Sequence, residues 1–124
     1  AARHPLAICS MGRRDEIEPV LNDAGLRRLF TALVTSDDVS KPKPDPEIYL
    51  RGLELLNASR GMIVRPEECV VVEDSCGGTR SGKAAGMKVV ALTHSLTEAE
   101  LRGAGADVVL DGILSLADFL TKSM

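Results

Sequence analysis

The stretch that most constrains the fold is residues 69–79, Cys-Val-Val-Val-Glu-Asp-Ser-Cys-Gly-Gly-Thr. Its first four residues are apolar and mostly β-branched, which is typical of a strand covered on both faces of a sheet. Glu73 and Asp74 stand where that strand ends, and Ser75 is suited to capping a following helix. Because ligands of open α/β sheets bind beyond the carboxyl ends of the strands, this turn is a predicted binding site.

The two neighbouring carboxylates of the turn indicate a cation. Adjacent negative charges repel each other, and both remain ionised only when a positive charge is near. Oxygen ligands of this kind suit Mg²⁺. We therefore expect Asp74, together with Glu73, to hold magnesium. A solvated acidic turn is the alternative when the stretch is considered alone.

The rest of the chain alternates short apolar runs with helical patterns. The expected strands cover residues 6–10, 32–35, 69–72, 88–92 and 107–110, and the expected helices cover residues 17–24, 46–56, 79–85, 96–103 and 114–120. This alternation predicts an α/β fold, a Rossmann-like parallel sheet with helices on both faces. With 124 residues, the chain is long enough for one domain, residues 1–124, and too short for two.

Charge and cysteine content narrow the range of partners. The net charge of −3 offers no basic surface for nucleic acid. No apolar run approaches the roughly 20 residues of a membrane span, and no signal peptide is visible. The three cysteines, Cys9, Cys69 and Cys76, are odd in number and lack metal-ligand spacing, so we expect reduced thiols in a cytoplasmic protein.

Two further polar residues are expected at the same edge of the sheet as the acidic pair. Ser10 ends the first predicted strand, and Lys43 lies in the proline-rich loop Lys-Pro-Lys-Pro-Asp-Pro after the second. A hydroxyl donor, a fixed ammonium and a carboxylate pair are the groups needed to grip a phosphoryl group. Lys41 is the alternative lysine of this loop. Arg13 and Arg14 are explained either by contact with substrate or by an exposed helix start.

These motifs, in this order, resemble the haloacid dehalogenase superfamily, in its branch of β-phosphoglucomutases and phosphoglycolate phosphatases. Residues 6–10 resemble its second motif, residues 41–49 its third, and residues 70–87 its fourth. The resemblance implies a magnesium-dependent hydrolase or mutase acting on a small phosphorylated metabolite. Ser10 and Lys43 would be its catalytic and phosphate-binding residues, and Asp74 and Glu73 would hold Mg²⁺. Phosphatase chemistry is favoured over dehalogenation, which needs no magnesium.

One motif of that superfamily is absent from residues 1–124. Its first strand ends in Asp-x-Asp-x-Thr, and the first of these Asp residues is the nucleophile. Neither this strand nor the helical cap that usually selects the substrate is present in the sequence. The resemblance therefore implies a partial core domain without its central N-terminal strand. We expect the isolated chain to be inactive, and to be completed by a missing N-terminal segment or by an oligomer partner.

Two other functions compete with this interpretation. A non-catalytic binding module on the same scaffold would explain the absent nucleophile. A phosphoacceptor receiver domain also combines carboxylates, a lysine and a hydroxyl residue, but its acidic pair belongs on the first strand and its lysine near the last, the reverse of the order here. A dinucleotide site is disfavoured because the turn after Asp74 lacks the G-x-G-x-x-G spacing.

Overall fold

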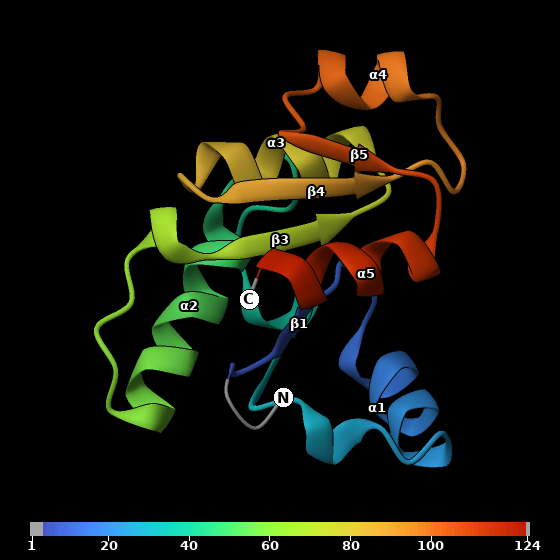
Figure 1. Cartoon of the computed structure of the whole chain (residues 1–124). Helices are drawn as coiled ribbons and strands as arrows, with labels where there is room; N and C mark the ends of the chain where they lie inside the picture. Colours follow the sequence, from blue (N-terminus) through green and yellow to red (C-terminus); the bar gives the residue numbers. More distant parts are fainter. Residues whose placement is uncertain (1–3, 124) are drawn as a thin grey trace.

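Parallel strands alternate with helices through residues 4–123, the part of the chain that this computed structural model describes (Figure 1). The strands are β1 (Ala7–Cys9), β2 (Ala32–Val34), β3 (Val70–Glu73), β4 (Lys88–Leu92) and β5 (Val108–Leu110). The α-helices are α1 (Arg14–Asp23), α2 (Glu47–Arg60), α3 (Cys76–Ala84), α4 (Glu98–Gly103) and α5 (Ile113–Ser123), with short 3₁₀ turns at Arg27–Leu29, Ser36–Asp38 and Pro66–Glu68. The predicted α/β, Rossmann-like class is confirmed.

The strands form two separate parallel sheets. β1 pairs with β2, and β3, β4 and β5 form the second sheet in that order. Figure 1 shows β1 and β3 as the neighbouring strands of the two sheets, with α5 drawn in front of the space between them. Within the described residues no strand pairing joins β1 to β3. Among the described residues, β1 and β3 are therefore each paired along one edge only.

The larger core lies where α2 and α3 pack against the strands. Val34, Ile48 and Val89 are completely buried in it, and α2 contacts β1, β2 and α3. On β3, Val71 is only 5% exposed, whereas Val70 and Val72 are 44% and 43% exposed. The prediction that this strand is covered on both faces is therefore wrong. Val70 and Val72 line the open space toward β1 instead.

Helix starts follow the side chains expected of them, with two shifts in position. The Ser75 hydroxyl accepts a hydrogen bond from Gly78 N at 3.0 Å, so α3 begins at Cys76, three residues before its predicted start. The helix expected at residues 46–56 begins at Glu47, with Pro46 as its N-cap. Asp45 Oδ1 accepts a hydrogen bond from Glu47 N at 2.9 Å. Its carboxylate therefore satisfies a backbone N–H of the first turn that has no partner within the helix. No helix of the described residues is long and apolar enough to cross a bilayer.

Gly82 allows α3 to pack closely on the sheet. A Cβ added at Gly82 would lie 2.7 Å from Val89 Cγ2, whereas one at Gly77 on the same helix would meet nothing within 4 Å. Gly82→Ala is expected to lower the free energy of unfolding by about 1–3 kcal/mol through overpacking. The matched Gly77→Ala is expected to raise it by about 0.5–1 kcal/mol, because alanine favours helix. Urea denaturation measures both, and equal effects would contradict this packing.

Arg14 belongs to the scaffold. Its guanidinium donates to Leu33 O and to Asp38 Oδ2, both at 2.8 Å, which ties α1 to the end of β2. Arg13 is exposed and lies near Asp15, with 3.3 Å between Nε and Oδ1. Neither arginine is among the described residues that line the cavity between the sheets. Of the two explanations that the sequence left open, the start of a helix is the one that these contacts support.

The Asp38 carboxylate gives this region a pH dependence. The backbone N–H of Thr35, followed by the Arg14 guanidinium and the Thr35 hydroxyl, holds the pKa of Asp38 below its ordinary value. A carboxyl group whose pKa is lowered by folding stabilises the native state above its unfolded pKa of about 3.9, and that stabilisation is lost as the pH falls through the lower folded value. Asp38→Asn is therefore expected to flatten the decline of stability below about pH 4. Thermal denaturation measured from pH 6 to pH 3 tests this prediction. A decline of stability equal to that of the wild type would contradict it.

Candidate active site

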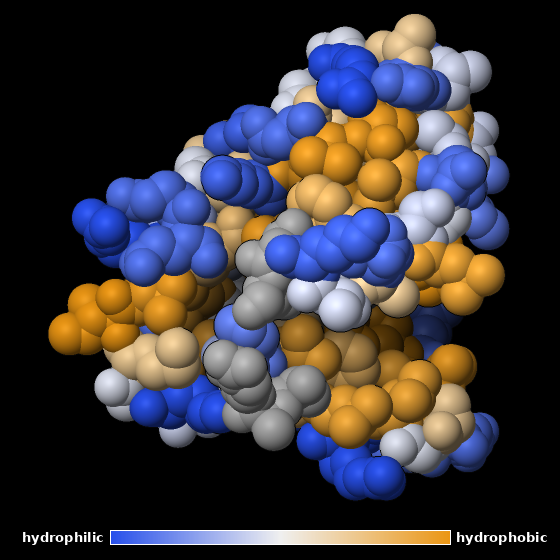
Figure 2. Space-filling model, viewed as in Figure 1, coloured by the Kyte–Doolittle hydropathy of each residue, from blue (hydrophilic) through white to orange (hydrophobic). Residues whose placement is uncertain are grey.

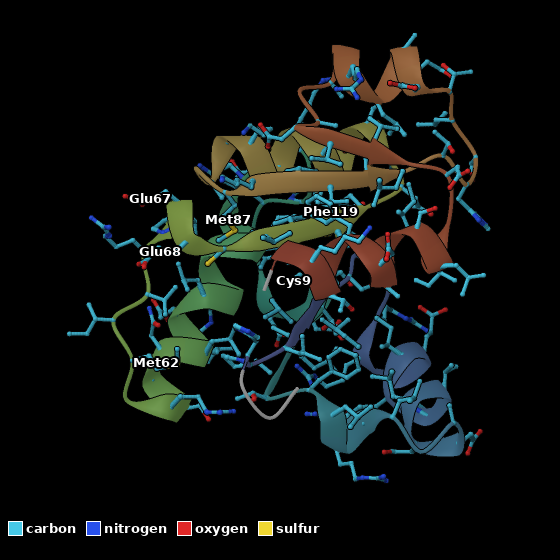
Figure 3. The ribbon with its side chains drawn as sticks, viewed as in Figure 1. Cys9, Met62, Glu67, Glu68, Met87 and Phe119 are labelled. Carbon is cyan, nitrogen blue, oxygen red and sulfur yellow. The ribbon has the colours of Figure 1, made fainter. Side chains whose placement is uncertain are left out.

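A cavity of about 1060 Å³ lies between the two sheets, and the four predicted site residues line one part of it. The cavity is lined by Ser10 from the end of β1, by Lys43 from the proline-rich loop, and by Glu73 and Asp74 from the end of β3. Figure 2 shows apolar side chains gathered in the band between the upper and lower parts of the molecule. Cys9 and Met87, both labelled in Figure 3, also line the cavity. The four candidate residues thus lie in the wall of a cavity whose other lining residues are mostly apolar.

Ser10 directly follows β1 and remains aligned with the sheet. Its backbone N–H donates to Val34 O at 2.9 Å, which continues the pairing with β2. Its Oγ accepts a hydrogen bond from Gly12 N at 3.2 Å. The hydroxyl hydrogen donates to no residue that the structure describes, and so it remains available to an acceptor in the cavity.

Lys43 is held by contacts from several elements. Its Nζ donates to Glu73 Oε2 at 2.6 Å and to Cys9 O at 3.2 Å, and its side chain is 15% exposed. An ammonium has three donors, so one N–H remains for an anion. The loop itself is tied to α3, because Ser81 Oγ donates to Asp45 O at 2.6 Å. Lys41 is exposed, so these contacts support Lys43 as the functional lysine.

Glu73 points inward and is fully engaged. Its Oε2 accepts from Lys43 and from the Tyr49 hydroxyl, and its Oε1 accepts from Ser75 Oγ at 3.2 Å and Asp74 N at 3.3 Å. The side chain is only 8% exposed. It lies so close to α3 that a Cβ added at Gly78 would come within 2.0 Å of Glu73 Cδ. A buried carboxylate in this position chiefly balances the charge of Lys43.

Asp74, the next residue, is exposed and faces the cavity. Its carboxylate has no hydrogen-bond or ion-pair partner among the described residues, so it is free to bind a cation. Residues 4–123 contain no group of three or more acidic, histidine or cysteine side chains arranged to hold a metal. The two carboxylates therefore differ: Asp74 is open to a ligand and Glu73 is occupied.

Two residues of the site had no functional signal in the sequence. Tyr49 lies inside the helix expected at residues 46–56, and its bond to Glu73 was not predicted from the sequence. Burial, reinforced by the charge of Glu73, raises the pKa of Tyr49. Burial also raises the pKa of the Cys9 thiol to about 11, so Cys9 is protonated at neutral pH and is no nucleophile. All three cysteines are free, as expected.

Comparisons with known proteins show the family. Residues 1–92 match the model of the haloacid dehalogenase-like hydrolases. The chain is 34% identical to a putative β-phosphoglucomutase from Thermotoga maritima, with a TM-score of 0.87 over 99% of this chain and 55% of that one. It is 30% identical to a hydrolase from Deinococcus radiodurans whose crystal structure contains bound phosphate and sodium, with a TM-score of 0.84 over 98% of this chain and 53% of that one.

A curated enzyme of known activity is also similar. The validoxylamine A 7'-phosphate phosphatase of Streptomyces hygroscopicus is 39% identical over 108 residues, which are 87% of this chain and 47% of that protein. The chain belongs to the haloacid dehalogenase-like hydrolase family, and it resembles the family's phosphatases and phosphomutases. It spans about half the length of these relatives.

Proposed function

We propose that this chain supplies the phosphate- and metal-binding part of a magnesium-dependent phosphatase or phosphomutase acting on a small phosphorylated metabolite. The observation that carries the proposal is the convergence of Ser10, Lys43 and Asp74 on one cavity, from segments far apart in the sequence. They offer a hydroxyl donor, a free N–H of an ammonium and an unengaged carboxylate. This is the set of charges and donors that a phosphoryl group bound with a divalent cation requires.

Each residue has a defined task in this proposal. Lys43 and Ser10 donate hydrogen bonds to the equatorial oxygens of the transferring phosphoryl group, where negative charge is concentrated in the transition state. Asp74 would be the magnesium ligand, because its unengaged carboxylate is a hard oxygen donor of the kind that Mg²⁺ requires. Glu73, which the sequence also suggested as a ligand, would instead hold Lys43 in place, because both of its oxygens already accept hydrogen bonds. Bound Mg²⁺ would neutralise the negative charge of the phosphate dianion.

The nucleophile would come from a segment outside residues 1–124. The absent Asp-x-Asp-x-Thr motif and the unjoined edges of β1 and β3 support a strand inserted between them. A carboxylate oxygen at its end would attack phosphorus, forming a P–O bond as the bond to the leaving oxygen breaks. Water would then release inorganic phosphate, or a substrate hydroxyl would accept the phosphoryl group. A segment preceding residue 1, or a partner molecule that carries the motif, would supply this strand.

The test compares the chain alone with a fusion in which a strand ending in Asp-x-Asp-x-Thr precedes residue 1. Hydrolysis of p-nitrophenyl phosphate is measured with Mg²⁺ and with EDTA. We expect turnover only in the fusion with magnesium, and no turnover when the first Asp of the added motif is replaced by Asn. A folded fusion that is inactive would favour the alternative, a non-catalytic binding module, for which the absent nucleophile is the specific support.

The cellular compartment is a further part of the proposal. We propose the cytoplasm, because the three cysteines are free and reduced thiols persist in reducing compartments.

A further inference from the structure

Tyr49, Lys43 and Glu73 form one contact unit in the wall of the cavity. The Tyr49 hydroxyl donates to Glu73 Oε2, the oxygen that also accepts from Lys43 Nζ at 2.6 Å. The same Nζ lies 5.1 Å from the centroid of the Tyr49 ring. Each member of the unit therefore contacts the other two, although Tyr49 and Glu73 are 24 residues apart in sequence.

The ring of Tyr49 is firmly placed by its helix. Tyr49 lies in the first turn of α2 and is 9% exposed. Its neighbours Ile48 and Leu53 are buried in the core. One turn later, α2 approaches β1 so closely that a Cβ added at Gly52 would lie 2.7 Å from Cys9 Sγ. The hydroxyl is thus presented to Glu73 from a rigid support, which a flexible surface side chain would not provide.

Glu73 Oε2, the oxygen that Tyr49 and Lys43 share, determines the orientation of the Lys43 ammonium. Glu73 Oε1 is held by Ser75 and by the backbone of Asp74, so Oε2 is the oxygen that faces Lys43. With the Tyr49 hydroxyl bound to Oε2, hydrogen bonds hold both oxygens of the Glu73 carboxylate. Lys43 donates two of its three N–H groups, one to Glu73 and one to Cys9 O. Its third N–H then has one fixed direction.

We propose that Tyr49 is a positioning residue, whose hydroxyl fixes the Glu73 carboxylate so that Lys43 presents its remaining N–H to an anion in the cavity. The role of that anion rests on the proposed function above, whereas the fixing of Lys43 does not. Tyr49→Phe isolates the hydroxyl, because it keeps the ring, its volume and its contact with the ammonium. A hydrogen bond to a charged group contributes roughly 1.5–3 kcal/mol, which corresponds to a change of about tenfold or more in an equilibrium constant.

The matched control is Thr79→Val, because Thr79 also carries a completely buried hydroxyl, and this one has no partner among the described residues. The primary measurement is NMR relaxation of the Lys43 side-chain ammonium. We expect a high order parameter for the Lys43 ammonium in the wild-type chain and in Thr79→Val. In Tyr49→Phe we expect this order parameter to fall toward that of the exposed Lys122. Equal order of Lys43 in all three proteins would overturn the proposal.

A second measurement holds even where Tyr49→Phe fails to fold. Tyr49 is the only tyrosine and the chain has no tryptophan, so the tyrosine bands of the near-ultraviolet absorption and emission spectra report this side chain alone. Glu73→Gln is expected to change both spectra, whereas Asp74→Asn is expected to leave them unaltered. A wild-type spectrum equal to that of a solvated tyrosine would show that the bond to Glu73 is absent, and would end the proposal.

Binding of inorganic phosphate with Mg²⁺, followed by ³¹P NMR, separates this inference from the proposed function. We expect Tyr49→Phe to weaken phosphate binding about tenfold and Thr79→Val to leave it within twofold. A wild-type chain that binds no phosphate would contradict the phosphate role of Lys43 and leave the order measurement to decide the role of Tyr49. Binding that is equal in the wild type and Tyr49→Phe would contradict the role of Tyr49 toward the anion.

Discussion

Replacing Lys43 by methionine is expected to lower the free energy of unfolding by about 3–5 kcal/mol, the usual cost of leaving one member of a buried ion pair without its partner. Lys43 and Glu73 are only 15% and 8% exposed, and their charged atoms lie 2.6 Å apart. The Tyr49 hydroxyl and the Ser75 hydroxyl still bind the carboxylate in the variant, which favours the lower end of this range. Urea denaturation followed by circular dichroism measures the change.

Two companion variants make this result specific. Lys41→Met changes an exposed lysine of the same loop and is expected to alter stability by less than about 0.5 kcal/mol. The double variant Lys43→Met/Glu73→Gln removes both charges, and we expect it to be more stable than Lys43→Met alone. In the active fusion, the double variant should remain at least a hundredfold less active than the parent, because the donor to the phosphoryl group is gone. Equal losses for Lys41→Met and Lys43→Met would contradict the assignment of the lysine.

Asp74→Asn is expected to reduce magnesium-dependent turnover of the active fusion by about a thousandfold, because a metal ligand stabilises charge that develops in the transition state. Stability should change little, since Asp74 is exposed and its carboxylate binds no described residue. The measurement is phosphate release as a function of Mg²⁺ concentration.

Asp23→Asn is the matched control, because Asp23 is also an exposed aspartate and lies at the end of α1, outside the cavity lining. It should keep the parent's rate and magnesium dependence. Turnover of Asp74→Asn at the parent rate, with an unchanged magnesium requirement, would remove Asp74 from its proposed role.

The elements of the fold were predictable because they depend on local patterns. The apolar run at residues 88–92 became β4 at the predicted bounds, and Ser75 caps α3 as its type and place indicated. Both features depend only on neighbours along the chain.

The convergence of the four candidate residues on one cavity was predictable, and the hydrogen bonds among them were not. Ser10, Lys43 and the acidic pair were placed at one edge because parallel strands bring their carboxyl ends together. The bond between Tyr49 and Glu73 could not be foreseen, because periodicity tells which face a side chain occupies and not which partner its hydroxyl finds. The exposure of Val70 and Val72 was missed for a related reason. An apolar sequence predicts a buried strand, but it does not tell whether another strand is present beside it.

Among the described residues no strand pairing joins the two sheets. They are linked by α2, which contacts β1 and β2 on one side and α3 on the other, and by Lys43, which bonds to Cys9 O and to Glu73. Their separation can therefore change without breaking any hydrogen bond between strands. An extended segment between β1 and β3 would displace no existing strand pairing. It would acquire backbone partners on both sides at once and join the two sheets into one.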